Sequence, residues 1–350
     1  MLKRLLMLLS IMLLALLAAC GGGGESDDTD TAESDTQGEE TTETSDDGDV
    51  ITLKVGHTLS STSHYQEGLE YFKEILAEKT DGRMDVEIFP DGSLGGERDM
   101  VEGLQIGSVD LVLTSTGPMS GFVEEITVVD LPFLFRDAEH AHNVLDGEVG
   151  QDLLDKLDSI DLKGLAWWEN GFRNITNNER PVEKPEDLDG LKLRTMENDI
   201  HMASFRELGV DPTPMAFPEL FTAMQQGVVD GNENPIPVIY SSRFYEVQDY
   251  LTMSRHFYNP SILLTSTDFF AGLEPDLQEA LEEAAVEAGI FEREVVQRMD
   301  EEYVDELEAE GMEVVRDFDA EPFIEAVQPV YDEYEDFFGK DLIDKIRNQE

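Results

Sequence analysis

The sequence predicts an α/β protein with two lobes, and three observations lead to this expectation. Short runs of β-forming residues alternate with amphipathic helical segments, which is the pattern of α/β folds. Residues 50–350 provide about 300 residues, and a chain of this length usually divides its hydrophobic core. A helix–glycine–strand pattern also occurs twice, around residues 104–110 and 224–230.

Residues 1–19 have the features of a secretory signal peptide. Lys3 and Arg4 give a positive start, residues 5–17 form a short apolar core interrupted only by Ser10, and small residues precede Cys20, the only cysteine. This order is typical of a bacterial lipoprotein signal, and the apolar run is short for a transmembrane helix. We therefore expect lipidation of Cys20 and a lipid-anchored protein outside the cytoplasm, in the periplasm or at the cell surface.

Residues 20–49 form an acidic segment that we expect to be a disordered tether. From residue 21 onward it contains 12 acidic residues, no basic residue and no hydrophobic residue larger than Ala32. Such a composition cannot build a core, and repulsion between like charges keeps the segment extended.

The remaining chain is strongly acidic, with 66 acidic and 22 basic residues between 50 and 350. This charge argues against nucleic acid and anionic lipid surfaces as partners. It suits a halophilic acidic surface, because high salt screens the self-repulsion.

The folded part opens with a predicted β-α-β unit. "VITLKVGHT" has the composition of a strand, "YQEGLEYFKEILAEKT" has helical periodicity, and "MDVEIFP" predicts the next strand. If the two strands are parallel, the crossover is right-handed.

The two copies of the helix–glycine–strand pattern suggest a common device in both lobes. "LQIGSVD" (104–110) and "MQQGVVD" (224–230) share Gln, Gly, Val and Asp at the same positions. In this register Glu97 corresponds to Phe217 at the helix starts, and Thr114 corresponds to Asn234 four residues after each Asp. If the lobes face one another, these four residues line opposing walls of one cleft.

Residues 275–311 predict either one long helix or two shorter ones. Pro275 suits a first helical turn and Gly311 suits a helix end, while Gly289 is a possible kink. A single helix would reach roughly 50 Å and could brace both lobes.

The sequence contains no motif that indicates an enzyme, a cofactor or a metal site. His140 and His142 are two residues apart on a predicted helix, so they point to different faces, and we interpret them as helix surface. "DGNENPIPVIYS" begins like a calcium loop but has Pro235 in place of the glycine and Ser241 in place of the last glutamate. We therefore expect a binding protein with neither cofactor nor metal.

Several ordered segments resemble the solute-binding subunits of TRAP transporters, a family that binds C4-dicarboxylates, sialic acid and related organic acids. The matching segments are "DLPFLFRDAEHAHNVLDGEVG", "GLKLR", "PTPMAF", "QQGVVDGNENP" and "SSRFYEVQDYLT". The resemblance runs from about residue 52 to 335. It implies a type II periplasmic-binding-protein fold, in which two α/β lobes enclose a ligand cleft and a long helix spans both.

The resemblance also implies roles for individual residues. Arg194, in "GLKLR", matches the arginine that holds the ligand's carboxylate, for which a planar guanidinium is well suited. Arg173 matches a second cleft arginine, Asn234 the asparagine that orients the carboxylate, Phe217 an aromatic residue on the ligand, and Glu97 an acidic residue of the opposite lobe. Weaker candidates for ligand contact are Thr58, His64, Thr114, Ser115 and Trp168.

The expected function is capture of a small organic acid by lobe closure, followed by delivery to the small and large permease subunits of a TRAP transporter. The alternative is an ABC-type receptor for another small anion. We expect one lobe to comprise residues 50–172 and 262–300, and the other lobe residues 173–261 and 301–350.

Overall fold

The computed structural model describes residues 50–349. The predicted signal peptide, the tether and Cys20 lie outside the described residues. No helix within this described part is both long enough and apolar enough to cross a membrane.

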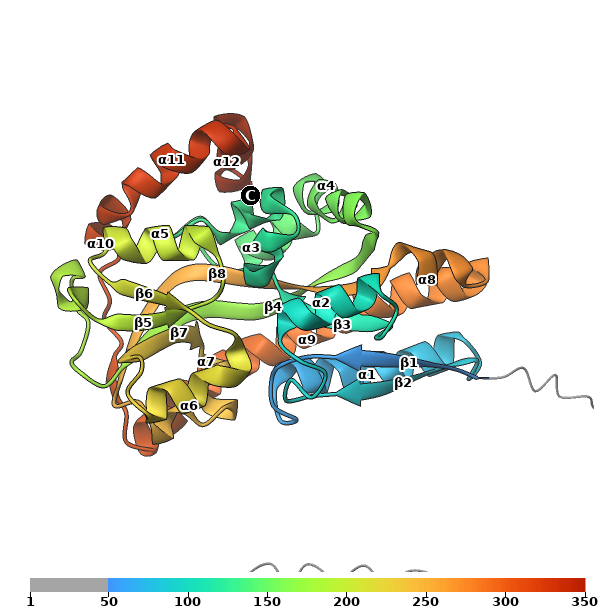
Figure 1. Cartoon of the computed structure of the whole chain (residues 1–350), viewed down its shortest axis with the longest axis horizontal. Helices are drawn as coiled ribbons and strands as arrows, with labels where there is room; N and C mark the ends of the chain where they lie inside the picture. Colours follow the sequence, from blue (N-terminus) through green and yellow to red (C-terminus); the bar gives the residue numbers. More distant parts are fainter. Residues whose placement is uncertain (1–49, 350) are drawn as a thin grey trace, which may run out of the picture. The chain divides into compact units, whose positions relative to one another are not determined.

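Within residues 50–349 nine strands form one mixed sheet, in the order β2-β1-β3-β8-β4-β7-β5-β6, with β9 paired to β8. Their bounds are β1 Ile51–Gly56, β2 Met84–Phe89, β3 Leu111–Ser115, β4 Leu162–Asn177, β5 Lys192–Thr195, β6 Asp211–Pro214, β7 Gly231–Pro235, β8 Tyr250–Ser266 and β9 Glu313–Val315. The long antiparallel strands β4 and β8 lie between the group β1, β2, β3 and the group β5, β6, β7 (Figure 1). The sheet thus contains two parallel groups joined by shared central strands.

The predicted β-α-β unit is confirmed, since β1 and β2 are parallel and α1 connects them. The helices are α1 His64–Lys79, α2 Glu97–Gln105, α3 Ala138–Leu145, α4 Glu148–Asp155, α5 Asp199–Glu207, α6 Leu220–Gln225, α7 Ile236–Ser241, α8 Thr267–Gly272, α9 Pro275–Ala309, α10 Glu321–Ala326, α11 Gln328–Phe338 and α12 Lys340–Arg347. Six short 3-10 turns connect the described elements: η1 Gly117–Gly121, η2 Glu124–Asp130, η3 Lys156–Ile160, η4 Pro185–Leu188, η5 Phe217–Glu219 and η6 Phe244–Glu246.

The sequence pattern at 104–110 and 224–230 corresponds to one structural device used twice. In each copy a helix ends before a glycine with positive φ, at Gly107 and Gly227, and a strand follows. The side chain of Asp110 accepts a hydrogen bond from Lys54 N at 2.8 Å, and that of Asp230 accepts one from Lys192 N at 2.8 Å. β3 is therefore attached to β1 in the same way as β7 is attached to β5.

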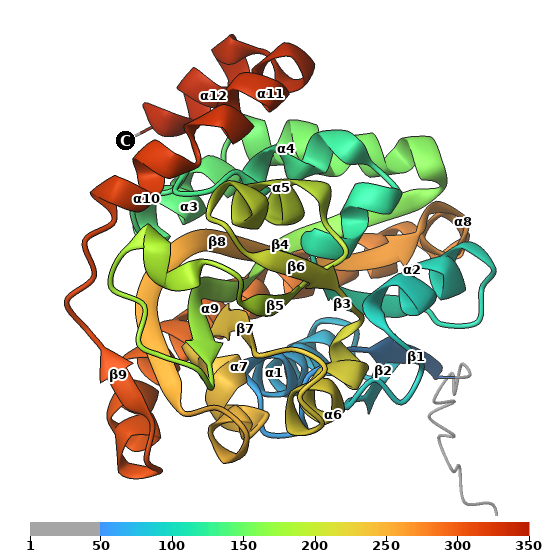
Figure 2. The same ribbon diagram turned by 60° about the vertical axis from the view of Figure 1, so that its left-hand side comes forward.

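A single long helix packs against α1, the central strand β4 and α7. α9 has 35 residues, begins with Pro275 in its first turn and ends just before Gly311. Its first half joins the apolar cluster under β1 and β3, and its last turns join the cluster around α6 and α7. Figure 2 shows α9 running behind the sheet, with α1 and α7 nearby.

Gly289 serves close packing in this helix. A Cβ at this position would lie 2.8 Å from Cδ1 of Trp168 and 2.9 Å from the carbonyl oxygen of Trp167. The absence of a side chain therefore lets α9 approach β4 closely, with Nε1 of Trp168 donating to Ala285 O at 3.1 Å.

The interpretation of both α3 histidines as helix surface is wrong for His140. Its side chain is buried, and one ring nitrogen lies 2.8 Å from Ile346 O on the C-terminal helix α12. His142 faces elsewhere and lies 2.8 Å from the Glu169 carboxylate. The different faces follow from helical spacing, whereas the burial of His140 depends on α12, which is distant in sequence.

Candidate functional site: an anion cleft between two strand groups

Side chains from both strand groups meet at a narrow cavity. Most of its lining residues lie on β4, just after the ends of β1 and β5, near the ends of β3 and β7, or at the starts of α2 and η5. Ligands of open α/β sheets bind at such strand ends, where the strand order changes direction. The lining residues are Thr58, Leu59, Tyr65, Glu97, Ser115, Asn170, Arg173, Arg194, Met196, Phe217 and Asn234.

A wider chamber adjoins this cavity on its outer side. The inner cavity has a volume of about 10 Å³, and the chamber has a volume of about 250 Å³. The two spaces share four lining residues, Glu97, Arg194, Met196 and Phe217, so they form one cleft with a narrow inner end.

Arg194 brings a buried positive charge to this cleft without a carboxylate partner. Its Nε donates to Met215 O at 2.9 Å, while Nη1 is buried and forms no hydrogen bond within residues 50–349. The guanidinium lies 6.0 Å from the centre of the Phe217 ring. Burial and the nearby Arg173 lower the pKa of Arg194 to about 10, so the side chain still carries its charge at neutral pH.

Arg173, in contrast, is fully occupied by the protein itself. Its Nε donates to Oε2 of Glu233, and its Nη2 donates to Oε1 of the same carboxylate at 2.8 Å. Both side chains are buried, and the positive charge of Arg173 helps to hold the pKa of Glu233 far below its usual range against the opposing effect of burial. Nη1 also donates to Oδ1 of Asn259 at 3.0 Å.

Glu97 presents a carboxylate on the opposite wall. Its Oε1 accepts hydrogen bonds from Ser115 N at 2.7 Å, from Ser115 Oγ at 2.9 Å and from Thr114 Oγ1 at 3.2 Å. These three neutral donors fix the carboxylate without cancelling its charge. Oε2 accepts no hydrogen bond from any residue in the described part of the chain.

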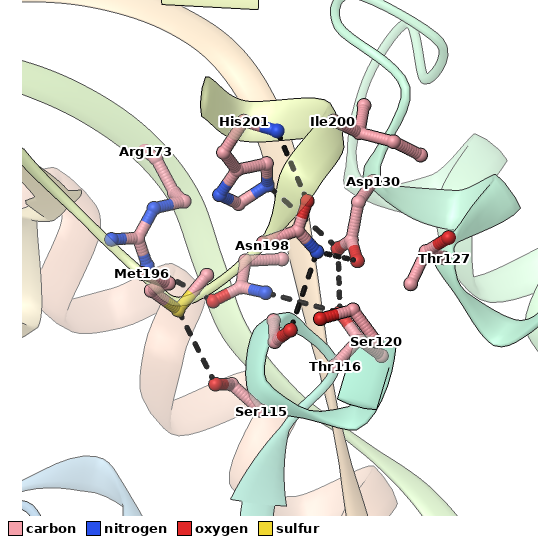
Figure 3. Close-up of polar contacts among 12 residues, drawn as sticks. Ser115, Thr116, Ser120, Thr127, Asp130, Arg173, Met196, Asn198, Ile200 and His201 are labelled. Atoms are coloured by element: carbon pink, nitrogen blue, oxygen red, sulfur yellow. Dashed lines mark hydrogen bonds and ion pairs between the residues drawn. The ribbon is translucent and has the colours of Figure 1, made fainter. Parts of the chain in front are cut away.

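A buried polar network joins Thr116 and Asp130 to the start of α5 (Figure 3). Asp130, at the end of η2, accepts from Thr116 Oγ1 at 2.7 Å and from Asn198 Nδ2 at 2.9 Å. Asn198 caps α5, with its Oδ1 accepting from His201 N at 3.0 Å. Burial raises the pKa of Asp130 to about 7, even though both donors oppose the shift.

Comparison with known proteins identifies the family. Residues 55–336 match the family described as DctP, bacterial extracellular solute-binding protein, family 7. The chain belongs to this family. Like its solved relatives, it is a TRAP-type solute-binding protein with the two-lobed periplasmic-binding fold, and proteins of this type act outside the cytoplasm.

Three relatives show how closely this TRAP-type protein resembles known members. The solved TRAP periplasmic solute-binding protein from Polaromonas sp. JS666, bound to D-erythronate, is 46% identical with a TM-score of 0.84, over 86% of this chain and 99% of that chain. The 2,3-diketo-L-gulonate-binding periplasmic protein of Escherichia coli K12 is 37% identical, over 83% of this chain and 88% of its own length. The C4-dicarboxylate-binding protein of Bacillus subtilis 168 is 34% identical, over 85% and 86% of the two chains.

In this TRAP-type protein most of the sequence-predicted site residues lie together. Seven of them line the inner cavity: Thr58, Glu97, Ser115, Arg173, Arg194, Phe217 and Asn234. Thr114 lies behind Glu97 and donates to it. The other two candidates lie deeper: Trp168 packs against α9, and His64 is fully buried with its Nε2 3.9 Å from the Glu292 carboxylate.

Five residues of the cleft region were missed by the sequence reasoning, among them the apolar Leu59, which follows the predicted Thr58. Met196 follows Arg194 by two positions, so strand alternation could have placed it on the same side. Glu233 precedes Asn234, and alternation would have assigned it to the opposite face, although it reaches Arg173. Tyr65 and Asn170 line the cavity, and no local motif marks either of them.

Proposed function

We propose that this protein captures a small organic acid in the cleft, with Arg194 binding the ligand's carboxylate, and delivers it unchanged to the permease subunits of a TRAP transporter. The buried guanidinium of Arg194 carries this proposal, because its Nη1 is a charged donor that the described residues leave without an acceptor. A planar guanidinium can form two parallel hydrogen bonds with one carboxylate.

Relatives of the chain support an organic acid as the ligand class. The names of similar proteins include a diketogulonate-binding protein, a C4-dicarboxylate-binding protein and a structure bound to D-erythronate. All three ligands carry at least one carboxylate. The family match favours a TRAP transporter over the ABC-type alternative, and it supports a protein that binds and releases its solute without catalysis.

Ligand binding would favour closure because the two walls of the cleft come from different strand groups. Arg194 lies at the end of β5, and Glu97 lies at the start of α2, which precedes β3. A ligand that contacts both walls binds the closed form more tightly than the open form and shifts the population toward it.

The proposed lobe boundaries cross β4 near residue 172, where the pairing with β8 has register shifts between Glu169 and Gly171 and between Arg173 and Ile175. These irregularities are suitable positions for a hinge.

We further propose that Cys20 carries a lipid and that residues 20–49 act as a tether. The lipobox-like end of the signal peptide supports the lipid anchor, and the 12 acidic residues of the tether support an extended segment. The folded domain would then reach its permease while remaining attached to the membrane.

The direct test is calorimetric titration of the purified protein with a panel of organic acids, after unfolding and refolding to remove bound ligand. The panel contains unsubstituted monocarboxylates, dicarboxylates and hydroxy acids. We expect one class to bind and the Arg194→Ala variant to lose that binding. Absence of binding by every acid in the panel would contradict the proposed function.

A further inference from the structure

Only one positive charge in the inner cleft is available to a ligand. Arg173 and Arg194 are the two cations among the residues that line the inner cavity. Glu233 accepts two hydrogen bonds from the guanidinium of Arg173 and so offsets part of its charge, and these bonds leave Arg173 less able than Arg194 to bind a ligand's carboxylate. A ligand with two carboxylates would therefore find one free guanidinium.

The rest of the cleft is unfavourable for a second carboxylate. Glu97 faces the space opposite Arg194, and the outer chamber adds the acidic residues Asp99, Glu197 and Glu219. The only additional cation of that chamber within the described chain, Arg98, pairs with Glu102 at 3.3 Å. Asp99, Glu197 and Glu219 are exposed and screened by solvent, so the main repulsion comes from the partly buried Glu97, which lines the inner cavity together with Arg194. Because like charges in one site repel, this wall selects against a second negative group.

The same wall offers hydrogen-bond acceptors. Oε1 of Glu97 is already used by three donors, which leaves Oε2 directed to other groups. A carboxylate oxygen is an acceptor, and its natural partner in a ligand is a hydroxyl group.

Asn170 provides a second acceptor at the inner end. Oδ1 of Asn259 accepts from Arg173, which is only a donor, so the group of Asn170 that faces it at 2.9 Å must be its Nδ2. The remaining Oδ1 of Asn170 is buried and has no hydrogen-bond partner within residues 50–349. The His64 ring does not satisfy this oxygen, because neither of its ring nitrogens forms a hydrogen bond.

From this pattern we propose that the ligand is a monocarboxylate with several hydroxyl groups, a sugar acid or a related hydroxy acid, and that Glu97 selects it over dicarboxylates. The proposal rests on the proposed function, because it takes Arg194 as the carboxylate site. One donor site at Arg194 and acceptors at Glu97 and Asn170 match a molecule that has an acceptor at one end and hydroxyl donors along its length. Succinate at neutral pH has acceptors only.

The test compares threonate, erythronate and gluconate with succinate, malate and butyrate on wild-type protein and on Glu97→Gln. Oε1 of the glutamine still accepts from Ser115, so its Nε2 replaces Oε2 and turns an acceptor into a donor. We expect the hydroxy monocarboxylates to lose roughly tenfold or more in affinity, as for loss of a hydrogen bond to a charged group. Succinate and malate should bind more tightly to Glu97→Gln than to wild type.

Glu87→Gln is the matched control. Glu87 is exposed on β2, so this variant removes the same charge from a position away from the cleft. It should leave the ratio of hydroxy-acid to succinate affinity within about twofold of wild type, since surface charges are largely screened. If Glu87→Gln changes the ratio as much as Glu97→Gln does, general charge explains the preference and the proposal is overturned.

The outcomes separate this inference from the proposed function. Tighter binding of succinate or malate than of every hydroxy monocarboxylate, with loss of binding in Arg194→Ala, overturns the inference and leaves the function intact. Binding of hydroxy monocarboxylates that Glu97→Gln does not weaken also overturns the role of Glu97. A wild-type protein that binds no acid of the panel overturns both.

Discussion

Arg194→Ala should abolish most of the ligand affinity while leaving the free protein folded. Arg194 is only 2% exposed, so the ion pair with a bound carboxylate forms in a largely desolvated site. Truncating one partner of such a hydrogen-bonded charge pair costs on the order of 3 kcal/mol, or roughly 150-fold in Kd. Arg194→Lys retains the charge but loses the planar fork, and we expect a cost of the same order.

The stability of the free protein distinguishes a binding role from a structural one. Burial lowers the pKa of Arg194 to about 10, which means that the folded state holds this charge at a cost. Arg194→Ala removes the cost of burying this charge but also loses the hydrogen bond to Met215 O. We therefore expect a free energy of unfolding within about 1 kcal/mol of wild type. Arg173→Ala is the contrasting control, because it leaves the buried Glu233 carboxylate without its cation and should cost about 3–5 kcal/mol.

Isothermal calorimetry measures the affinity, and urea unfolding with and without ligand measures the stability. At a ligand concentration a hundredfold above Kd, wild-type protein should gain about 2.7 kcal/mol, and Arg194→Ala should gain almost nothing at the same concentration. Retention of binding by Arg194→Ala within threefold of wild type would refute the assignment. A large loss of stability in the same variant would show instead that Arg194 serves the fold.

Three further predictions concern other parts of the chain. Burial raises the pKa of Asp130 from 3.8 to about 7, so between these pH values the folded protein retains a proton that the unfolded chain releases. The free energy of unfolding therefore falls as pH rises from about 4 to 7, by up to about 1.4 kcal/mol per pH unit. In urea titrations at several pH values, Asp130→Asn should therefore gain stability relative to wild type as pH rises, and a constant difference would contradict this. Gly289→Ala should destabilise the protein by about 1–3 kcal/mol, because the added Cβ would overlap Trp168. Gly272→Ala on α8 is the control and should be neutral or stabilising, because the added Cβ meets nothing within 4 Å. Equal shifts in melting temperature for the two variants would show that α9 has room for a side chain at residue 289. Cys20→Ser should move the protein from the membrane fraction to the soluble extracytoplasmic fraction, and fractionation that finds wild type already soluble would rule out the anchor.

The sequence predicts the parts of the fold that depend on local pattern. The first β-α-β unit follows from hydrophobic periodicity, and α9 follows from its composition together with Pro275 and Gly311. The choice between one helix and two depends on the packing of Gly289 against Trp168, which involves residues more than a hundred positions apart. Local pattern alone could not decide it.

In the candidate site, too, local sequence pattern predicts some residues, whereas contacts between distant residues decide the others. Repeat register alone placed Glu97, Phe217, Thr114 and Asn234 together. Three of the four line the inner cavity, whereas Thr114 lies behind Glu97 and donates to it. The partner of Arg173 could not be predicted, since Glu233 is one of many acidic residues and lies on a face that strand alternation assigns elsewhere. Because a charge in a site is defined by its partners, the difference between the two arginines becomes visible only in three dimensions.

This difference between the arginines also bears on how binding is coupled to closure. The strand pair β5 and β7 and the strand pair β1 and β3 are built alike, with Asp230 and Asp110 making the same contact to the neighbouring strand. Within the described residues, only the first pair carries a cleft guanidinium without a carboxylate partner, that of Arg194, and the second pair is adjoined by Glu97. In the proposed pose a carboxylate binds the Arg194 wall in the open protein, and the ligand's hydroxyl groups reach Glu97 only when the walls approach. A simple monocarboxylate could occupy Arg194 without stabilising the closed form, because a ligand shifts an equilibrium only by its difference in affinity for the two states. The acidic wall would thus decide which bound acids produce the closed protein that a permease can recognise.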